Sequence, residues 1–488
     1  MPQENRIKPK QAIVAAVQLP NVSDAELKVS LDELRELAAT LGYEVVGTFT
    51  QKRASFDAAA YFGTGKRDEL RAYVQGDANT AESNSADDDT PPRRASAADK
   101  KIARHGAVAA REAAKAHEAR AALAGDERRA DCVLVDHEIS PSQARNLENE
   151  IGCEVLDRTM VILEIFHRHA RSNAARAQVE IARLRYLAPR LREAAKLAGP
   201  QGRQRSGVGG RGAGEGAGEA DRAKIRDRIA ELQQEIIALD LERQTQRARR
   251  QQSQGLARVA LIGYTNAGKS TLMRALTGSD VLVANKLFAT LDTTVRALVP
   301  EGVPRVLVSD TVGFIKNLPH DLVASFKSTL EEATEASLLL HVIDASDPGF
   351  ERQMEVTETV LGEIEAGKVP RIRVFNKIDQ AGDAAAQKRH AAALRARYPT
   401  CIVMSAVIPV DIAKLQKTVR AFFQRRMVKA ELFLPWSAQQ LRGELFAQCE
   451  VLEERAEAEG AFFSVRGERA AIERLREMSE AAHDKTSR

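Results

Sequence analysis

Residues 263–271, GYTNAGKST, decide the fold of the central part of the chain. The stretch fits the pattern G-x-x-x-x-G-K-[ST], follows the apolar run RVALI and opens a helical pattern, so it has the context that a phosphate-binding loop requires. Gly263 and Gly268 permit the tight turn whose backbone N–H groups surround the α- and β-phosphates of a nucleotide. Lys269 supplies a charge between the β- and γ-phosphates, and the Ser270 hydroxyl coordinates Mg²⁺.

The sequence around this loop predicts a sheet. From Arg258 to Phe423, short and continuously apolar runs alternate with helical stretches. This alternation is typical of a buried, mostly parallel sheet in a doubly wound α/β fold. The expected strands are RVALIG, RVLVSD, LLLHVID, RIRVFN and CIVMSA.

A second motif for phosphate and metal is DTVGF, residues 310–314. Asp310 ends the run RVLVS, where a carboxylate would hold a Mg²⁺-bound water, and Gly313 lets its backbone N–H approach the γ-phosphate. Phe314 stands where a signalling GTPase carries the glutamine that orients the attacking water. Because a benzyl group has no donor or acceptor, intrinsic hydrolysis is expected to be slow.

Between these motifs lies the polar segment FATLDTT, residues 288–294. We expect it to be a mobile switch that offers Mg²⁺ a second hydroxyl. Thr290 is the first choice for this hydroxyl, with Thr293 and Thr294 as alternatives.

The stretch NKID, residues 376–379, follows the run RIRVF and predicts the choice of base. The Asp379 carboxylate can accept hydrogen bonds from the ring N–H and the amino group of guanine, whereas adenine would leave it unpaired. Asn376 would brace the loop, and the stem of Lys377 would lie along the base. The pair Ser405-Ala406 ends the run CIVM and would offer a backbone N–H to the guanine oxygen.

Together these motifs predict GTP or GDP and Mg²⁺ as ligands. The predicted catalytic residues are Lys269, Thr290 and Gly313, and the predicted metal ligands are Ser270, Thr290 and, through water, Asp310. The predicted nucleotide-binding residues are Gly263, Tyr264, Thr265, Asn266, Ala267, Gly268, Lys269, Ser270 and Thr271; Phe288, Ala289, Thr290, Leu291 and Asp292; Asp310, Thr311, Val312 and Gly313; and Asn376, Lys377, Ile378, Asp379, Ser405 and Ala406.

Four regions are expected along the chain. An N-terminal α/β domain spans 1–158 and is interrupted by a low-complexity insert at 77–130, which we expect to be disordered in part. A helical hairpin at 159–250, whose first helix is expected over 159–198, carries the glycine-rich loop 206–219, and the P-loop domain spans 256–428. A small α/β domain follows at 429–488. The stretch GTGKRDEL, which begins at Gly63, lacks the full phosphate-loop spacing and is interpreted as a loop and a helix start.

Composition limits the class of protein. The chain has 488 residues, with 72 basic and 68 acidic side chains, so its net charge of +4 is only a weak indication of a polyanionic partner. The four cysteines form no CxxC pair and are interpreted as reduced core residues. No apolar run is long enough to span a bilayer. We expect a cytoplasmic protein without stable membrane insertion, and we allow for a loosely membrane-associated fraction.

The order of GYTNAGKST, FATLDTT, DTVGF, NKID and SA resembles that in translation-factor-like P-loop GTPases. The stretch DTVGFIKNLPHDLVASFKSTLEEA is especially similar to the HflX family of ribosome-associated GTPases. YFGTGKRDEL and DHEISPSQARNLE resemble the N-terminal domain of that family, and GVGGRGAGEGAGEADRAKIRDRI resembles its glycine-rich loop and second helix. The chain departs from the family at 214–219, where members commonly carry Gly-Glu-Thr-Gln-Leu-Glu and this chain reads GEGAGE.

The resemblance implies a GTPase that binds the large ribosomal subunit, is stimulated by it, and acts in ribosome splitting, rescue or maturation. Ribosomal RNA would then lie near the glycine-rich loop, with Arg183, Arg185, Arg190 and Arg192 available to its phosphates, and the free protein would be monomeric. Composition alone instead favours a flexible linker at the loop, and it leaves a solvated helix face as an equal alternative at the arginines. Two alternatives stay open: a GTP-dependent regulator or scaffold without a ribosomal partner, and an ATP-consuming P-loop enzyme.

Overall fold

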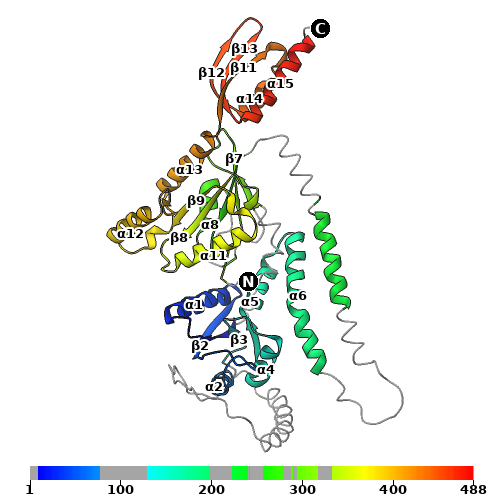
Figure 1. Cartoon of the computed structure of the whole chain (residues 1–488), viewed down its shortest axis with the longest axis vertical. Helices are drawn as coiled ribbons and strands as arrows, with labels where there is room; N and C mark the ends of the chain where they lie inside the picture. Colours follow the sequence, from blue (N-terminus) through cyan, green and yellow to red (C-terminus); the bar gives the residue numbers. More distant parts are fainter. Residues whose placement is uncertain are drawn as a thin grey trace, which may run out of the picture. The chain divides into compact units, whose positions relative to one another are not determined.

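The computed structural model describes residues 9–76, 129–197, 223–239, 241, 257–278, 287–288, 294–316 and 332–486. The chain divides into two compact units, which are described separately (Figure 1). One contains Met1–Glu164 and Pro189–Gly199, and the other contains Ile165–Ala188 and Pro200–Arg488. The glycine-rich loop 206–219 and the insert, except for residues 129 and 130, lie outside the described residues.

The N-terminal unit is built around a four-stranded parallel sheet. Its elements are β1 (Lys10–Gln18), α1 (Asp24–Thr40), β2 (Tyr43–Lys52), α2 (Thr64–Val74), β3 (Cys132–Val135), α4 (Pro141–Ile151) and β4 (Glu154–Asp157). The strand order is β2-β1-β3-β4, so β3, which follows the insert, pairs directly with β1. Helices α2 and α4 pack on the face that carries Ile13, Ala15 and Val17. The continuous apolar run of β1 fits a sheet that is buried on both faces.

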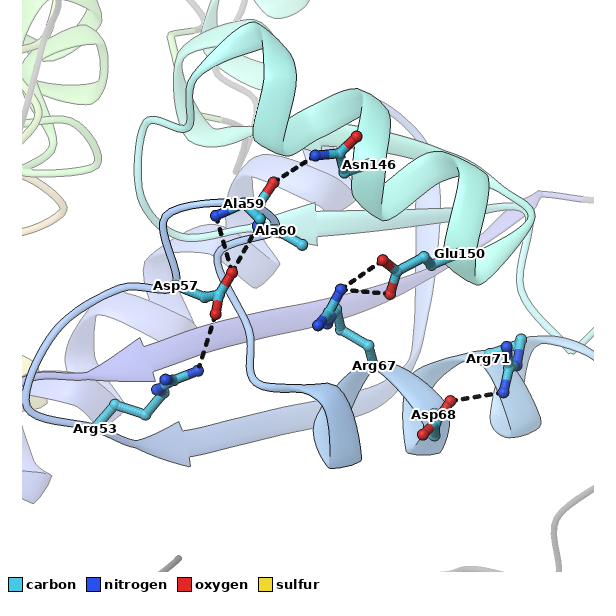
Figure 2. A network of polar contacts seen from close by, with 9 residues as sticks. All are labelled: Arg53, Asp57, Ala59, Ala60, Arg67, Asp68, Arg71, Asn146 and Glu150. Carbon is cyan, nitrogen blue, oxygen red and sulfur yellow. Dashed lines mark hydrogen bonds and ion pairs between the residues drawn. The ribbon is translucent and has the colours of Figure 1, made fainter. Parts of the chain in front are cut away.

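The stretch GTGKRDEL forms the end of a loop and the start of α2, as predicted. Gly63 is the N-cap of the helix, and Arg67 contacts both carboxylate oxygens of Glu150 on α4, at 2.5 and 2.6 Å (Figure 2). The loop before α2 is also fastened to α4, because Asn146 donates a hydrogen bond to Ala59 O at 2.7 Å. The ion pair joins α2 to α4, and the Asn146 hydrogen bond joins the preceding loop to α4.

The helical region differs from the prediction in one respect. The sequence pattern predicts a single helix over 159–198, whereas the structure has two, α5 (Arg158–His169) and α6 (Asn173–Leu197). The break follows from a local hydrogen bond, because Ser172 Oγ accepts the N–H of Ala175 at 3.2 Å. Serine at this position acts as an N-cap, which starts a new helix in place of continuing the old one.

A further helix, residues 223–239, lies beside α6 (Figure 1). Its Leu232 is buried against Ala177 and Ile181 of α6. Arg228 on this helix forms an ion pair with Glu180 of α6 at 3.0 Å. The two helices form the paired arrangement that the apolar stripes predict.

The P-loop domain contains a six-stranded sheet in the order β10-β9-β8-β5-β7-β6. All neighbouring pairs are parallel except β6 with β7. The sheet confirms the five predicted strands and adds β6, whose polar sequence TVRA carries no apolar run. The strands are β5 (Ala257–Ile262), β6 (Thr294–Ala297), β7 (Val306–Asp310), β8 (Leu338–Asp344), β9 (Arg371–Asn376) and β10 (Ile402–Val403).

Helices cover both faces of this sheet, which confirms the doubly wound fold. They are α8 (Lys269–Thr277), α11 (Phe350–Glu363), α12 (Ala384–Arg397) and α13 (Pro409–Gln424), with single turns at Ala366–Lys368 and Ile378–Gln380. Leu272 of α8 and Leu415 of α13 share one core with β5 and β8. Met354 of α11 and Leu394 of α12 belong to the core on the other face. This layering brings the carboxyl ends of the parallel strands to one edge, where ligands bind in such folds.

The C-terminal region is a three-stranded antiparallel sheet with helices on one face. Its elements are β11 (Val428–Pro435), a turn at Trp436–Ala438, α14 (Leu441–Gln448), β12 (Glu450–Ala456), β13 (Gly460–Gly467) and α15 (Arg469–Thr486). Phe463 of β13 is buried with Leu445 of α14 and Leu475 of α15. With this small domain, the predicted fold class is confirmed.

Three further findings concern the cysteines, the possible metal ligands and the helices of the described residues. All four cysteines have free thiols, and three of these are buried. The described residues contain no cluster of three or more His, Cys, Asp or Glu side chains that could hold a metal by themselves. Among the described helices, none is both long enough and apolar enough to cross a membrane.

Candidate functional site

The phosphate-binding loop leaves β5 at Gly263 and enters α8 at Lys269. Gly263 has φ of 142° and Gly268 has φ of 93°, in the region that side chains with a Cβ rarely adopt. A Cβ on Gly263 would collide with the carbonyl oxygen of Val342, and one on Gly268 would collide with the amide of Asn376. Both glycines are therefore required by the packing of the loop against β8 and β9.

Lys269 lies buried within this loop. Its Nζ donates hydrogen bonds to Gly263 O at 3.0 Å and to Tyr264 O at 2.7 Å. Burial lowers the pKa of Lys269 to about 8, opposed by the nearby carboxylate of Asp310. The two carbonyls hold the ammonium where a bound phosphate would meet it, so the lysine suits an anionic ligand.

The two residues that the motifs predict as magnesium ligands lie in contact. Ser270 Oγ donates a hydrogen bond to Asp310 Oδ2 at 2.8 Å, although the two residues are 40 positions apart. Asp310 is fully buried at the end of β7. A hydroxyl and a carboxylate at this separation are hard oxygen ligands of the kind that Mg²⁺ prefers. The residues present therefore fit a magnesium ion held with nucleotide phosphates.

The DTVGF stretch is fastened to the phosphate-binding loop through the backbone of Phe314. Thr265 N donates to Phe314 O at 2.7 Å, and Phe314 N donates to Gly263 O at 3.1 Å. The phenol of Tyr264 adds a third bond, because its Oη accepts the N–H of Lys316 at 2.8 Å. The Phe314 side chain is only 1% exposed, so its benzyl group is packed inside the domain in this conformation.

The hydrogen bonds between the DTVGF stretch and the phosphate-binding loop leave little space beside Lys269. A Cβ built on Gly313 would stand 2.9 Å from Lys269 Nζ and 3.0 Å from Thr265 Cα. A γ-phosphate has to lie between the lysine and Gly313. Binding of GTP therefore requires Gly313 to move away from the loop, and the three hydrogen bonds oppose this movement. GDP has no γ-phosphate, so its binding does not require the movement.

Tyr264→Phe should consequently favour GTP. The substitution removes only the phenol oxygen, so affinity for a non-hydrolysable GTP analogue should rise about two- to tenfold while affinity for GDP stays constant, since one hydrogen bond contributes ~0.5–1.5 kcal/mol. Nucleotide titration measures both affinities. Tyr398→Phe is the matched control, because that phenol donates to Glu351 of α11 and not to the DTVGF stretch or the residues after it. Equal changes for both nucleotides would contradict the interpretation.

The base-binding loops are joined by Asn376. Its Nδ2 donates to Ala267 O at 2.9 Å, and its Oδ1 accepts the N–H of Ala406 at 2.8 Å. Asn376 thus braces the loop, as predicted, and links it to the phosphate-binding loop. The pair Ser405-Ala406 was expected to offer a backbone N–H to guanine. In this structure the N–H of Ala406 donates to Asn376, and that of Ser405 donates to Asp411.

The carboxylate of Asp379 is placed to receive a ligand. Its Oδ1 is buried and has no hydrogen-bond partner among the described residues. A buried carboxylate oxygen without a donor is costly in a protein and calls for a partner. The ring N–H and amino group of guanine supply two such donors, so the residues present fit a guanine base. Asp379 belongs to the single turn Ile378–Gln380, and its neighbour Lys377 pairs with Asp344 at 2.7 Å.

The segment predicted as a switch is described only at its two ends. Phe288 is buried, and Thr294 begins β6, opposite Asp310 of β7. Thr294, an alternative choice for the magnesium ligand, is therefore part of a strand and lies opposite Asp310. Five predicted or alternative site residues lie outside the described residues: Ala289, Thr290, Leu291, Asp292 and Thr293.

The chain matches three family models that together span most of its length. A family model described as 50S ribosome-binding GTPase matches residues 258–377. The GTP-binding GTPase middle region matches 169–250, and the GTP-binding GTPase N-terminal model matches 28–101 and 101–167.

Individual relatives agree. A GTPase HflX from Gluconacetobacter diazotrophicus is 50% identical over 469 residues, which cover 95% of this chain and 97% of the relative. The GTPase HflX of Caldanaerobacter subterraneus is 40% identical over 370 residues, or 76% of this chain and 73% of the relative. The GTPase HflX of Escherichia coli is 47% identical over 255 residues, which cover 52% of this chain and 59% of the relative.

The chain belongs to the GTPase HflX family. As a member, it binds guanine nucleotides and hydrolyses GTP to GDP and phosphate. Membership also rules against the ATP-consuming alternative, in agreement with the Asp379 carboxylate at the base-binding loop.

Sequence reasoning missed several residues of this HflX site. Asp344 holds Lys377, and Asp411 accepts the N–H of Ser405 at 3.1 Å. The position of Asp344 at the end of LLLHVID, on the same sheet edge as Asn376, was a usable signal. Two residues of α5, Phe166 and His169, also contact the site, and no motif marks them.

Proposed function

We propose that this GTPase binds the large ribosomal subunit, that the subunit stimulates hydrolysis, and that the protein acts in ribosome splitting, rescue or maturation. The observation that carries the proposal is Phe314, an apolar and buried side chain where a water-orienting group would be needed. The missing transition-state interactions must come from a partner or from reordering of the switch. The match of residues 258–377 to the 50S ribosome-binding GTPase model supports the large ribosomal subunit as this partner.

The helical region supports an RNA partner in part. Arg185 lies exposed on α6, which leads toward the glycine-rich loop 206–219. Arg190 has a different role, because it forms an ion pair at 3.1 Å with the buried Asp157 and is mostly buried itself. Arg183 is half-buried, and the side chain of Arg192 lies outside the described ones. Of the described arginines in this set, we retain Arg185 as the best candidate for a phosphate contact.

The remaining predictions belong to this proposal. Mg²⁺ would be held by Ser270, by Asp310 through water and by Thr290, and Lys269, Thr290 and Gly313 would act on the γ-phosphate. The free protein would be a monomer in the cytoplasm. No segment among the described residues supports a membrane-associated fraction.

Single-turnover GTP hydrolysis with and without purified large subunits tests the stimulation. At saturating nucleotide, the subunits should accelerate hydrolysis by about 10³-fold or more, the range of groups supplied in trans. A rate unchanged by subunits would overturn the proposal. The same assay with Phe314→Ala separates two sources of activation: stimulation that survives the substitution shows that the partner, and not this side chain, positions the water.

Binding is tested separately by pelleting with large subunits in the presence of GTP, GDP or a non-hydrolysable analogue. A ribosomal role requires that the protein co-sediments and that the amount depends on the nucleotide. Absence of co-sedimentation with every nucleotide would favour the alternative, a GTP-dependent regulator or scaffold without a ribosomal partner.

A further inference from the structure

The last turn of α5 holds the residue that begins the predicted switch. The ring of Phe166 packs against the ring of Phe288, with 4.5 Å between the ring centres. His169 Nδ1 lies 2.9 Å from the carbonyl oxygen of Phe288. A carbonyl oxygen can only accept, so the Nδ1 atom of His169 carries the proton and donates it. One helical turn therefore contacts both the side chain and the backbone of Phe288.

The backbone of Phe288 is held in an unfavourable conformation. Its φ is 56°, in the left-handed region that residues other than glycine rarely occupy and that is especially uncommon for a bulky side chain. Such a conformation persists where several surrounding contacts hold it in place, and it occurs most often at functional sites. Phe288 is 3% exposed and Phe166 is completely buried, so the contact excludes water.

The position of Phe288 in the chain gives this contact a consequence. At the other end of the segment, Thr294 lies opposite Asp310, which accepts the hydrogen bond from Ser270. Five residues connect these two held positions. An extended chain spans at most about 3.5 Å per residue. The position at which α5 holds Phe288 therefore limits the reach of the connecting residues.

We propose that Phe166 and His169 are positioning residues for GTP hydrolysis, which act by holding Phe288 at the start of the switch. The inference rests on the proposed role of that segment beside Mg²⁺. Neither side chain touches the reacting atoms. The donor on His169 and the ring of Phe166 hold the backbone of Phe288, and this contact fixes one end of the segment whose other end, Thr294, lies opposite Asp310.

The chain offers a set of closely matched variants. His169→Leu removes the donor, whereas His169→Asn keeps an amide N–H near the position of Nδ1. His167→Leu makes the same change as the first variant at an exposed position of the same helix. Phe166→Leu keeps an apolar side chain but removes the contact between the rings.

The full-length variants are compared by single-turnover hydrolysis at saturating GTP and by GDP affinity, both without ribosomal subunits. His169→Leu and Phe166→Leu should each slow hydrolysis about three- to tenfold, as expected for the loss of one contact, with GDP affinity within twofold of the unmodified protein. His169→Asn should restore the rate to within twofold, and His167→Leu should leave it unchanged.

The inference is overturned if His169→Leu hydrolyses GTP at the unmodified rate or faster, or if His169→Asn is as slow as His169→Leu. An equal loss in His167→Leu would also overturn it, because the effect would then be one on the helix as a whole. Thr290→Ala separates this inference from the proposal it rests on. If Thr290→Ala is fully active, the proposed switch is wrong. If Thr290→Ala is slow while His169→Leu is not, only the positioning by α5 fails.

Discussion

Lys269→Ala should weaken binding of both GTP and GDP by about 100-fold, because the ammonium is the buried cation of the phosphate-binding loop and bonds to charged groups contribute ~1.5–3 kcal/mol each. Titration with a fluorescent GDP measures the loss. Ser270→Ala should act differently: it removes a metal ligand, so it should abolish productive binding of Mg·GTP while GDP binding without Mg²⁺ is less affected. Normal affinity and turnover in both variants would contradict the site.

The pKa of Lys269 gives this prediction a second readout. Burial lowers that pKa to about 8 in the ligand-free protein, and a bound phosphate raises it by stabilising the ammonium. Binding therefore takes up a proton once the pH exceeds about 8, and nucleotide affinity should fall as the pH rises from 7 to 9. The same dependence should vanish in Lys269→Ala. Lys414→Ala, at an exposed lysine of α13, should retain both affinity and its dependence on pH.

The parts of the site that sequence predicted are those placed by strand ends. Lys269 follows β5, Asp310 ends β7 and Asn376 ends β9, and these strands are parallel neighbours or nearly so. Because the carboxyl ends of parallel strands meet at one edge, finding the strands was enough to bring these residues together. The motifs therefore predicted that Ser270 and Asp310 lie close together, although not the hydrogen bond between them.

The parts that sequence missed depend on contacts between segments with no shared pattern. Nothing in the run around Phe166 indicates that its ring meets Phe288, since an apolar residue on a helix predicts burial but not its partner. The break at Ser172 was missed for a related reason. The apolar stripe continues through it, and a single N-cap hydrogen bond outweighs that periodicity.

The hydrogen bonds of the Phe314 backbone illustrate a third limit on prediction from sequence. The motif DTVGF predicts which residues approach the phosphates but not which conformation they adopt. Whether Phe314 turns out or packs inward depends on backbone bonds to Gly263 and Thr265, which lie about 50 residues earlier in the chain. The loop residue Tyr264 stands at a position where the phosphate-loop pattern accepts any side chain, so its bond to Lys316 could not be predicted.

Asp379→Asn should change the base that the protein selects. The carboxylate can accept from both the ring N–H and the amino group of guanine, whereas an asparagine offers one acceptor and one N–H₂ donor. Affinity for GTP should fall about 10²–10⁴-fold, because two donors of guanine lose a charged partner and one of them faces another donor. Xanthine carries a carbonyl oxygen in place of that amino group, so xanthosine triphosphate should bind the variant better than GTP does.

Competition titrations with guanosine, xanthosine and adenosine triphosphates measure this change in one experiment. Asp383→Asn is the matched control, because Asp383 lies four residues later and only caps α12 by accepting the N–H of Ala386 at 2.7 Å. It should keep the preference for guanine. A preference for guanine over xanthine that is unchanged in Asp379→Asn would show that another group reads the base. The buried Oδ1 of Asp379 would then need a different donor, and the fit of this carboxylate to guanine would fail with it.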